Sequence, residues 1–150
     1  MLEHNVEEKG HLRSFVLKLI QERLNQVERF TEFTVEASRD IKKTPKYDSI
    51  REEVQNEIFN LDKQVYELRQ MMSTMKRVIA SDTEEIRWGS VVITNKARFY
   101  ISVSLGEFFY KNDRFYAISL ESPLAQKMIG LKPGDEFQLN GIHQKIVVVF

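Results

Sequence analysis

The sequence has no cysteine, little proline or glycine, no net charge and no long hydrophobic run. Its 150 residues include 3 Pro and 6 Gly. Without cysteine the chain can form neither disulfides nor thiolate metal sites. Its 22 basic residues balance 22 acidic ones, which argues against a general nucleic-acid binder, because such proteins are usually basic. The longest apolar stretch, FVLKLI at residues 15–20, is far too short to cross a membrane.

The composition that is present is typical of a soluble globular protein. Hydrophobic residues make up 42% of the chain and charged residues 29%, so a packed core is expected rather than disorder. The first ten residues, MLEHNVEEKG, are polar and do not have the pattern of a signal peptide, so we expect a loose tail there and a cytoplasmic location.

A heptad pattern runs through residues 46–80. Apolar residues recur at alternating gaps of four and three, and the other positions are mostly charged or amide side chains. This spacing predicts a long helix that packs against another helix as in a coiled coil. The predicted seam consists of Val54, Ile58, Leu61, Val65, Leu68, Met72, Met75 and Ile79.

A second long helix is predicted over residues 11–41, which contain no Pro or Gly. The segment KKTPK follows, and Pro45 cannot continue a helix but fits the first position of a new one, with Thr44 as its N-cap. A short loop at residues 42–44 therefore joins antiparallel neighbours. We predict an α-helical coiled-coil hairpin over residues 1–80. The expected seam of its first arm is Ile20, Leu24, Val27, Thr31, Thr34, Ser38 and Ile41.

The hydrophobic period changes to two after residue 80. Segments 86–95, 97–105, 107–112 and 114–121 are rich in β-branched and aromatic residues, which predicts strands. A short helix is expected after Ser122, with Ser122 as its N-cap, Pro123 as its first residue and Gly130 after its last turn. Turns are expected at Asn112–Asp113 and at Asn140–Gly141. Residues 81–150 are thus predicted to form a small antiparallel β domain with one short helix. The whole chain is of the α+β class.

Three segments of the sequence resemble the bacterial Gre transcript-cleavage factors. WGSVV at 88–92 and SPLAQKMIGLKPGDEF at 122–137 are similar to the Gre signature, and EASRDIKKTPKYDSIREE at 36–53 is similar to the family's hairpin tip without a gap. The resemblance covers nearly the whole chain. Within the tip segment, the family residues are matched by Tyr47, Arg51, Glu52 and Glu53.

The resemblance implies an FKBP-like fold for residues 81–150 and RNA polymerase as the partner. In Gre factors this domain lies at the rim of the polymerase secondary channel, and the coiled coil reaches the active site, where two tip acids help to hold Mg²⁺. We therefore expect a transcription elongation regulator without catalysis or a cofactor of its own. At most it stimulates the polymerase's own RNA cleavage and shares its Mg²⁺. The expected rim contacts are Ser122 and Pro123.

The tip departs from the Gre pattern in its charge. Asp40 matches the first acidic position of the family, whereas Lys43 stands at the second. A lysine removes one metal ligand and repels the cation, so we expect weak or no stimulation of cleavage. Asp40 is then the candidate ligand for the polymerase-held Mg²⁺. Glu36 and Asp48 lie about a helical turn from the tip, so replacement of the second acid by one of them is open but is not indicated. The residues expected at the tip in the channel are Glu36, Asp40, Lys42, Lys43, Lys46, Tyr47 and Asp48.

Simpler explanations and other functions stay open. The tip lysines could be solvated loop charges, and the aromatic residues after position 98 are better explained as sheet core than as a nucleic-acid stacking face. The histidines show no metal-ligand spacing. The alternatives are an FKBP-like prolyl isomerase or chaperone and a self-associating hairpin scaffold. We expect indirect contact with the RNA 3′ end, no membrane contact and a monomer, with a dimer left open.

Overall fold

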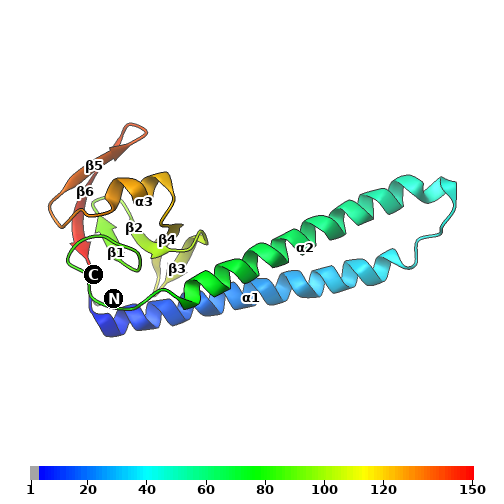
Figure 1. The fold of residues 1–150 in the computed structure, drawn as a ribbon, viewed down its shortest axis with the longest axis horizontal. Helices are drawn as coiled ribbons and strands as arrows, with labels where there is room; N and C mark the ends of the chain where they lie inside the picture. Colours follow the sequence, from blue (N-terminus) through cyan, green and yellow to red (C-terminus); the bar gives the residue numbers. More distant parts are fainter. Residues whose placement is uncertain (1–3) are drawn as a thin grey trace. The chain divides into compact units, whose positions relative to one another are not determined.

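The computed structural model describes residues 4–150. A long helical hairpin is followed by a mostly antiparallel sheet with a short helix, which confirms the predicted α+β class (Figure 1). The chain divides into two compact units, one of Lys18–Met72 and one of Met1–Leu17 with Ser73–Phe150. The domain boundary at residue 80 and the FKBP likeness stay predictions. The described helices are α1 (Val6–Ser38), the 3-10 helix η1 (Pro45–Tyr47), α2 (Asp48–Lys76) and α3 (Pro123–Met128).

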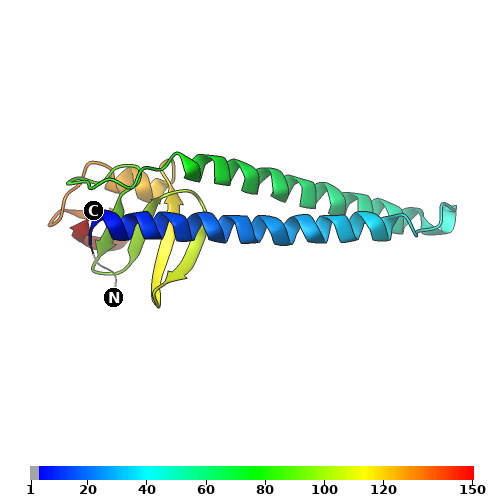
Figure 2. The same ribbon diagram turned by 90° about the horizontal axis from the view of Figure 1, so that it is seen from below.

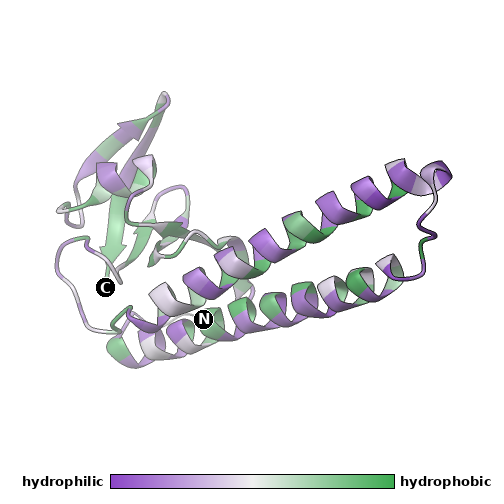
Figure 3. Cartoon of the chain, turned by 45° about the vertical axis from the view of Figure 1, so that its right-hand side comes forward, coloured by the Kyte–Doolittle hydropathy of each residue, from purple (hydrophilic) through white to green (hydrophobic). Residues whose placement is uncertain are grey.

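The two long helices are amphipathic, as the heptads predict, and both show alternating hydrophobic and hydrophilic residues in Figure 3. Within residues 18–72, Leu24, Val65 and Leu68 form a buried cluster to which Val27 adds a half-buried side chain. Other seam residues nearer to the loop, such as Ile58, are only half-buried. The buried seam is therefore best developed away from the tip. Among residues 4–150, no helix is long and apolar enough to span a bilayer.

The start of α1 differs from the prediction. Residues 1–3 of the expected tail lie outside the described residues, but α1 begins at Val6 and passes through Gly10 without a break (Figure 2). The backbone N–H of Glu8 donates to the Asn5 side chain over 2.8 Å, which satisfies a free amide of the first turn. The prediction failed because Glu8 and Lys9 are buried, although they are charged.

The end of α2 also differs, because the helix stops at Lys76 and Ile79 is 71% exposed instead of continuing the seam. Arg13 donates hydrogen bonds to the carbonyls of Lys76 (2.7 Å) and Val78 (2.6 Å), so these carbonyls have a partner outside the helix. The backbone then comes close to Gly89, where an added Cβ would lie 2.9 Å from the Ile79 carbonyl oxygen. Gly89 also has a φ of +94°, which a residue with a side chain rarely adopts.

The sheet contains all six strands in the order β3-β4-β2-β1-β6-β5. The sheet is mostly antiparallel, as predicted, with one exception, since β2 and β4 are parallel. The chain passes from β2 to the sheet edge in β3 and turns back in β4, which then lies beside β2 in the same direction. The described strands are β1 (Val91–Thr94), β2 (Arg98–Ser102), β3 (Gly106–Tyr110), β4 (Asp113–Ser119), β5 (Glu136–Leu139) and β6 (Ile142–Val149).

The turns are partly as predicted. Asn140 (φ 53°) and Gly141 (φ 78°) form the two-residue connection between β5 and β6. The turn between β3 and β4 uses Lys111 (φ 50°) and Asn112 (φ 67°), one residue earlier than predicted. Asp113 instead pairs with Tyr110 as the first residue of β4.

The sheet core is aromatic and aliphatic, as expected. Trp88 packs against it and donates from Nε1 to the Ser102 carbonyl over 3.0 Å. Phe109, by contrast, is 54% exposed on β3. Aromatic residues with buried side chains are Phe99, Tyr100, Phe108, Tyr110, Phe115, Phe137 and Phe150.

The first turns of α1 belong to the same compact unit as the sheet. The Phe15 ring lies 5.1 Å from the Tyr110 ring and 6.3 Å from the Phe108 ring, measured between centroids. Lys9 donates from Nζ to the Ser81 carbonyl over 2.6 Å. The start of α1 is therefore held by both aromatic packing and polar contacts.

Candidate functional site at the hairpin tip

The tip is the loop between α1 and α2, where the predicted functional residues gather. After Ser38 the chain makes a turn in which the Asp40 N–H donates to the Ala37 carbonyl (3.2 Å) and the Ile41 N–H to the Ser38 carbonyl (3.3 Å). Pro45 then opens the 3-10 helix η1, as its fixed φ favours. Thr44 occupies the predicted N-cap position, but it makes no side-chain cap bond.

Arg51 fastens the loop to α2. Its Nη1 donates to the carbonyls of Lys42 (2.6 Å) and Thr44 (3.1 Å), and its Nη2 pairs with the Asp48 carboxylate. A planar guanidinium can make these bonds at once because its donors point in fixed directions. Arg51 therefore determines the path of the loop. Its positive charge is already paired with Asp48 and with the two loop carbonyls.

The predicted tip residues are on the surface. Glu36, Asp40 and the three lysines Lys42, Lys43 and Lys46 are exposed, and the Lys46 Nζ lies 5.8 Å from the centroid of the half-buried Tyr47 ring. Asp48 is exposed but is held by Arg51. Asp40 has no hydrogen bond or ion pair from a side chain in the described part of the chain. Of the three predicted tip acids, Asp40 and Glu36 are thus without a side-chain partner in the described part of the chain, and Asp40 lies nearer to the loop.

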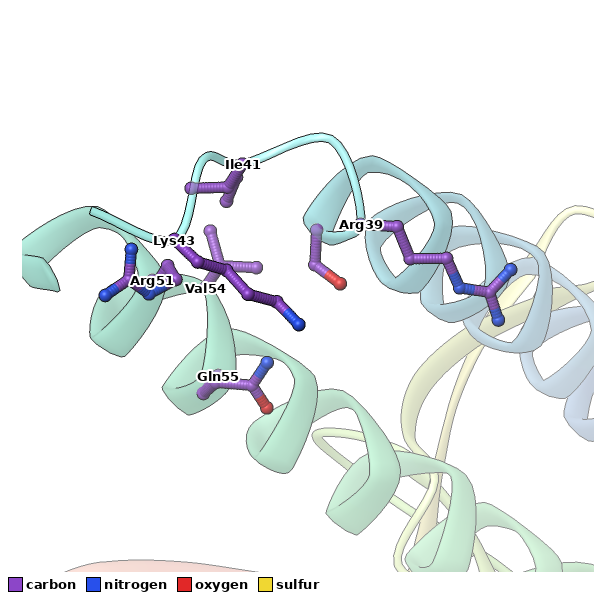
Figure 4. A pocket seen from close by; sticks show the side chains of 7 residues that line it. Arg39, Ile41, Lys43, Arg51, Val54 and Gln55 are labelled. Carbon is purple, nitrogen blue, oxygen red and sulfur yellow. The ribbon is translucent and has the colours of Figure 1, made fainter. Parts of the chain in front are cut away.

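A pocket of about 310 Å³ lies between the end of α1, the loop and the first turns of α2. Figure 4 shows Lys43 extending from the loop towards Gln55, whereas the Arg39 side chain projects from the other wall away from Lys43. Ile41 and Val54 supply apolar surface. We call this the tip pocket, and it is lined by Ser38, Arg39, Ile41, Lys43, Arg51, Val54 and Gln55.

The tip pocket has a positive lining. It contains Arg39, Lys43 and Arg51 and no carboxylate. Residues 4–150 contain no group of three Asp, Glu or His side chains arranged to hold a metal ion. The site is therefore suited to an anion and not to an independent metal centre.

Sequence reasoning identified only part of this pocket. Lys43 was predicted as a tip residue, and Ile41 was placed on the seam with Val54. Arg39 and Gln55 were missed, because they carry no motif and come together only when the loop closes. Only one feature of the sequence could indicate that Arg39 and Gln55 line a pocket, which is their position next to a predicted hairpin turn.

Ser122 and Pro123 lie in the other compact unit. The Ser122 hydroxyl accepts a hydrogen bond from the Ala125 N–H over 3.1 Å, and Pro123 begins α3. The structure thus confirms their predicted role as a helix start. Their contact with polymerase stays a prediction.

Comparisons with known proteins find a likeness among solved structures only. No protein-family model matches the chain, and no curated protein matches it. Among solved structures, the chain is similar to the structure of the transcription factor Gfh1, with 20% identity and a TM-score of 0.32. The match covers 99% of this chain and 95% of that chain. At these values membership of the Gre family stays a prediction.

Proposed function

We propose that the chain is a Gre-like regulator of transcription elongation that binds RNA polymerase. The C-terminal domain would lie at the rim of the secondary channel, and the hairpin tip would enter the channel. Support comes from the sequence resemblance at residues 36–53 and 122–137 and from an exposed tip at the end of two long helices. The 29 residues of α2 have a length of about 44 Å at 1.5 Å per residue, which suits a narrow channel.

The observation that carries the proposal is the distribution of charge at the tip. Asp40 is exposed, whereas Asp48 is engaged by Arg51 and Lys43 stands where the second Gre acid belongs. Mg²⁺ needs near-octahedral oxygen coordination, so a single carboxylate can only supplement ligands that another protein provides. Asp40 would supply that one oxygen to the polymerase-held ion.

The proposed consequence is occupation of the channel with little or no stimulation of cleavage. Lys43 near the polymerase Mg²⁺ would repel the cation and would favour contact with RNA phosphates. The chain would then compete with a cleaving Gre factor for the same channel. We propose no catalytic activity and no bound cofactor for the chain itself.

The test uses a backtracked transcription complex made with RNA polymerase from the same host. RNA length is followed in Mg²⁺ with the chain alone and with the chain added before a cleaving Gre factor. We expect no shortening above the intrinsic rate with the chain alone and a slower reaction of the Gre factor. Absence of binding to polymerase by gel shift or co-sedimentation would exclude the proposal.

Substitutions at the tip distinguish the role of Lys43 from that of Asp40 in RNA cleavage. Lys43→Glu restores a second acid, so it should raise RNA cleavage at least about tenfold above the unmodified chain, the effect of recovering a Lewis-acid ligand. The double variant Asp40→Asn with Lys43→Glu should lose this gain. If the unmodified chain already cleaves as fast as the Lys43→Glu variant, the assigned role of Lys43 is wrong.

A further inference from the structure

The tip pocket carries positive charge that no acid in its lining balances. Arg51 is engaged by Asp48 and by loop carbonyls, but Lys43 and Arg39 make no side-chain hydrogen bond or ion pair with the described residues. Both side chains are exposed, so each can rotate about its flexible stem. Lys43 extends over the tip pocket, whereas the Arg39 side chain projects away from it and also lines a second concavity that contains Glu32 and Glu36. An anion in the tip pocket would therefore meet Lys43 first, and it would draw Arg39 in from the other wall.

We propose that the tip pocket binds a small phosphate-bearing ligand, no larger than a mononucleotide. A phosphate group has several acceptor oxygens and up to two negative charges, so it can accept from a lysine and an arginine at once. Lys43 would act as a point charge, and Arg39 would turn inwards to offer its paired N–H groups. Gln55, beside Lys43 in Figure 4, can add an amide N–H donor.

The size and the remaining lining limit the ligand. A volume of about 310 Å³ lies at the lower end of the range for ligand pockets, so a dinucleotide or a larger cofactor would not be enclosed. Ile41 and Val54 form a small apolar surface that can contact a sugar or one edge of a base. A phosphate with a compact organic part fits this combination better than a bare inorganic ion.

This inference does not depend on polymerase binding, because the pocket is formed by residues 38–55 of the chain alone. Its experiment therefore uses the purified full chain without polymerase. A failure of phosphate binding and a failure of the proposed transcription function would be seen in different assays.

The experiment is an NMR titration with inorganic pyrophosphate and with adenosine monophosphate at constant ionic strength. The reporters are the methyl signals of Ile41 and Val54 and the side-chain amide of Gln55. We expect saturable shifts with both phosphates and none with adenosine. Lys43→Gln and Arg39→Gln should each weaken binding about tenfold, the loss typical of one charge-assisted hydrogen bond.

Two matched variants show whether the pocket itself binds. Lys63→Glu changes the charge of an exposed α2 residue outside the pocket, and it should leave the affinity for pyrophosphate unchanged. Lys42→Glu changes a loop charge next to Lys43 whose side chain does not line the pocket, and it should weaken binding less than Lys43→Glu does. The dispersion of each variant's amide spectrum reports whether it is folded.

Several results would overturn the proposal. Non-saturable shifts, or equal losses in Lys42→Glu and Lys43→Glu, would mean attraction to general surface charge. Succinate binding as tightly as pyrophosphate would remove the preference for phosphate. Binding of short single-stranded RNA but not of either small phosphate would assign the pocket to nucleic acid instead.

Discussion

The Tyr110 hydroxyl donates a buried hydrogen bond of 2.8 Å to a carboxylate oxygen of Glu8, which lies 102 positions earlier in the sequence. The Lys111 ammonium lies 2.6 Å from the same oxygen. One acid in the first turn of helix α1 is thereby joined to the turn between β3 and β4. Burial and the bond to Glu8 raise the pKa of Tyr110 to about 12.

The contrast between Tyr110 and Tyr100 gives the first prediction. Both rings are buried, but the Tyr100 hydroxyl has no hydrogen-bond partner among the described residues. Tyr110→Phe should lower the free energy of unfolding by about 1 kcal/mol, because it removes a made bond, whereas Tyr100→Phe should leave it unchanged or raise it. Urea denaturation measures both. A loss for Tyr100→Phe as large as that for Tyr110→Phe would show that the Tyr100 hydroxyl is satisfied.

Glu8 predicts how stability responds to acid. Hydrogen bonding from Lys111 is the main reason why the pKa of Glu8 is lowered from its ordinary value of 4.5, and burial opposes this only in part. Tyr110 and His11 are the other groups that face the carboxylate. Because the folded-state pKa is the lower one, the stabilisation is present above about pH 4.5 and is lost as the pH falls through the folded value.

The corresponding experiment compares Glu8→Gln with the unmodified chain at several pH values. The difference in the free energy of unfolding should be about 1 to 3 kcal/mol at neutral pH, the range for a charge-assisted bond, and should shrink below about pH 4. Glu7→Gln is the matched control, because Glu7 is adjacent on the same helix and exposed. A difference that does not change with pH would contradict the assigned ionisation.

For Lys9 the charged form lowers the free energy of unfolding instead of raising it, and this effect is seen at alkaline pH. Its side chain is buried, and burial lowers the pKa of Lys9 from 10.5 to about 8. A folded-state pKa below the unfolded one means that the charged lysine costs stability at neutral pH. The free energy of unfolding should therefore rise between about pH 8 and 10.5, by at most about 1.4 kcal/mol per pH unit.

Lys9→Met tests this effect. The variant keeps a long apolar side chain and leaves the exposed Ser81 carbonyl to water, so it should be at least as stable as the unmodified chain at pH 7. Its stability should lack the alkaline rise. If Lys9→Met unfolds more easily at pH 7 and shows the same rise, the bond from Lys9 to Ser81 stabilises the fold and another group titrates.

These two charged residues also show where prediction from sequence stopped. A polar segment with Glu8 and Lys9 has the local pattern of a solvated tail, and only contacts with Tyr110 and Ser81 bury it. Contacts between residues so far apart in the sequence produce no periodic pattern of hydrophobic residues around Glu8 and Lys9. The parallel pairing of β2 with β4 was missed for the same reason, because strand order depends on contacts between segments and not on the pattern within each strand.

Features governed by nearby residues were predictable. The heptad spacing placed Leu24, Val65 and Leu68 in the buried seam, and Ser122 begins α3 as its capping chemistry requires. The tip pocket is an intermediate case. The turn was visible at Pro45, but the meeting of Arg39 with Gln55 depends on the path of the loop, which the sequence pattern does not determine.

That path depends on Arg51, which gives the last prediction. Arg51→Met removes the donors to the carbonyls of Lys42 and Thr44 and the pair with Asp48, so the loop should become more mobile. Global stability should fall by less than about 1 kcal/mol, because these groups are on the surface. Arg51→Lys should restore the charge without restoring the loop, since an ammonium lacks the planar set of donors. Amide hydrogen exchange at residues 39–47 distinguishes the variants.

The control for Arg51 is Arg69→Met, which removes a surface arginine from the same helix. Arg69 makes a single contact of 3.5 Å with Glu28, and its loss should leave hydrogen exchange in the loop unchanged. Increased exchange in both Arg51 variants but not in Arg69→Met would show that donor geometry holds the loop. Full protection in Arg51→Lys would instead mean that charge alone is sufficient. The tip pocket would then tolerate either cation at position 51.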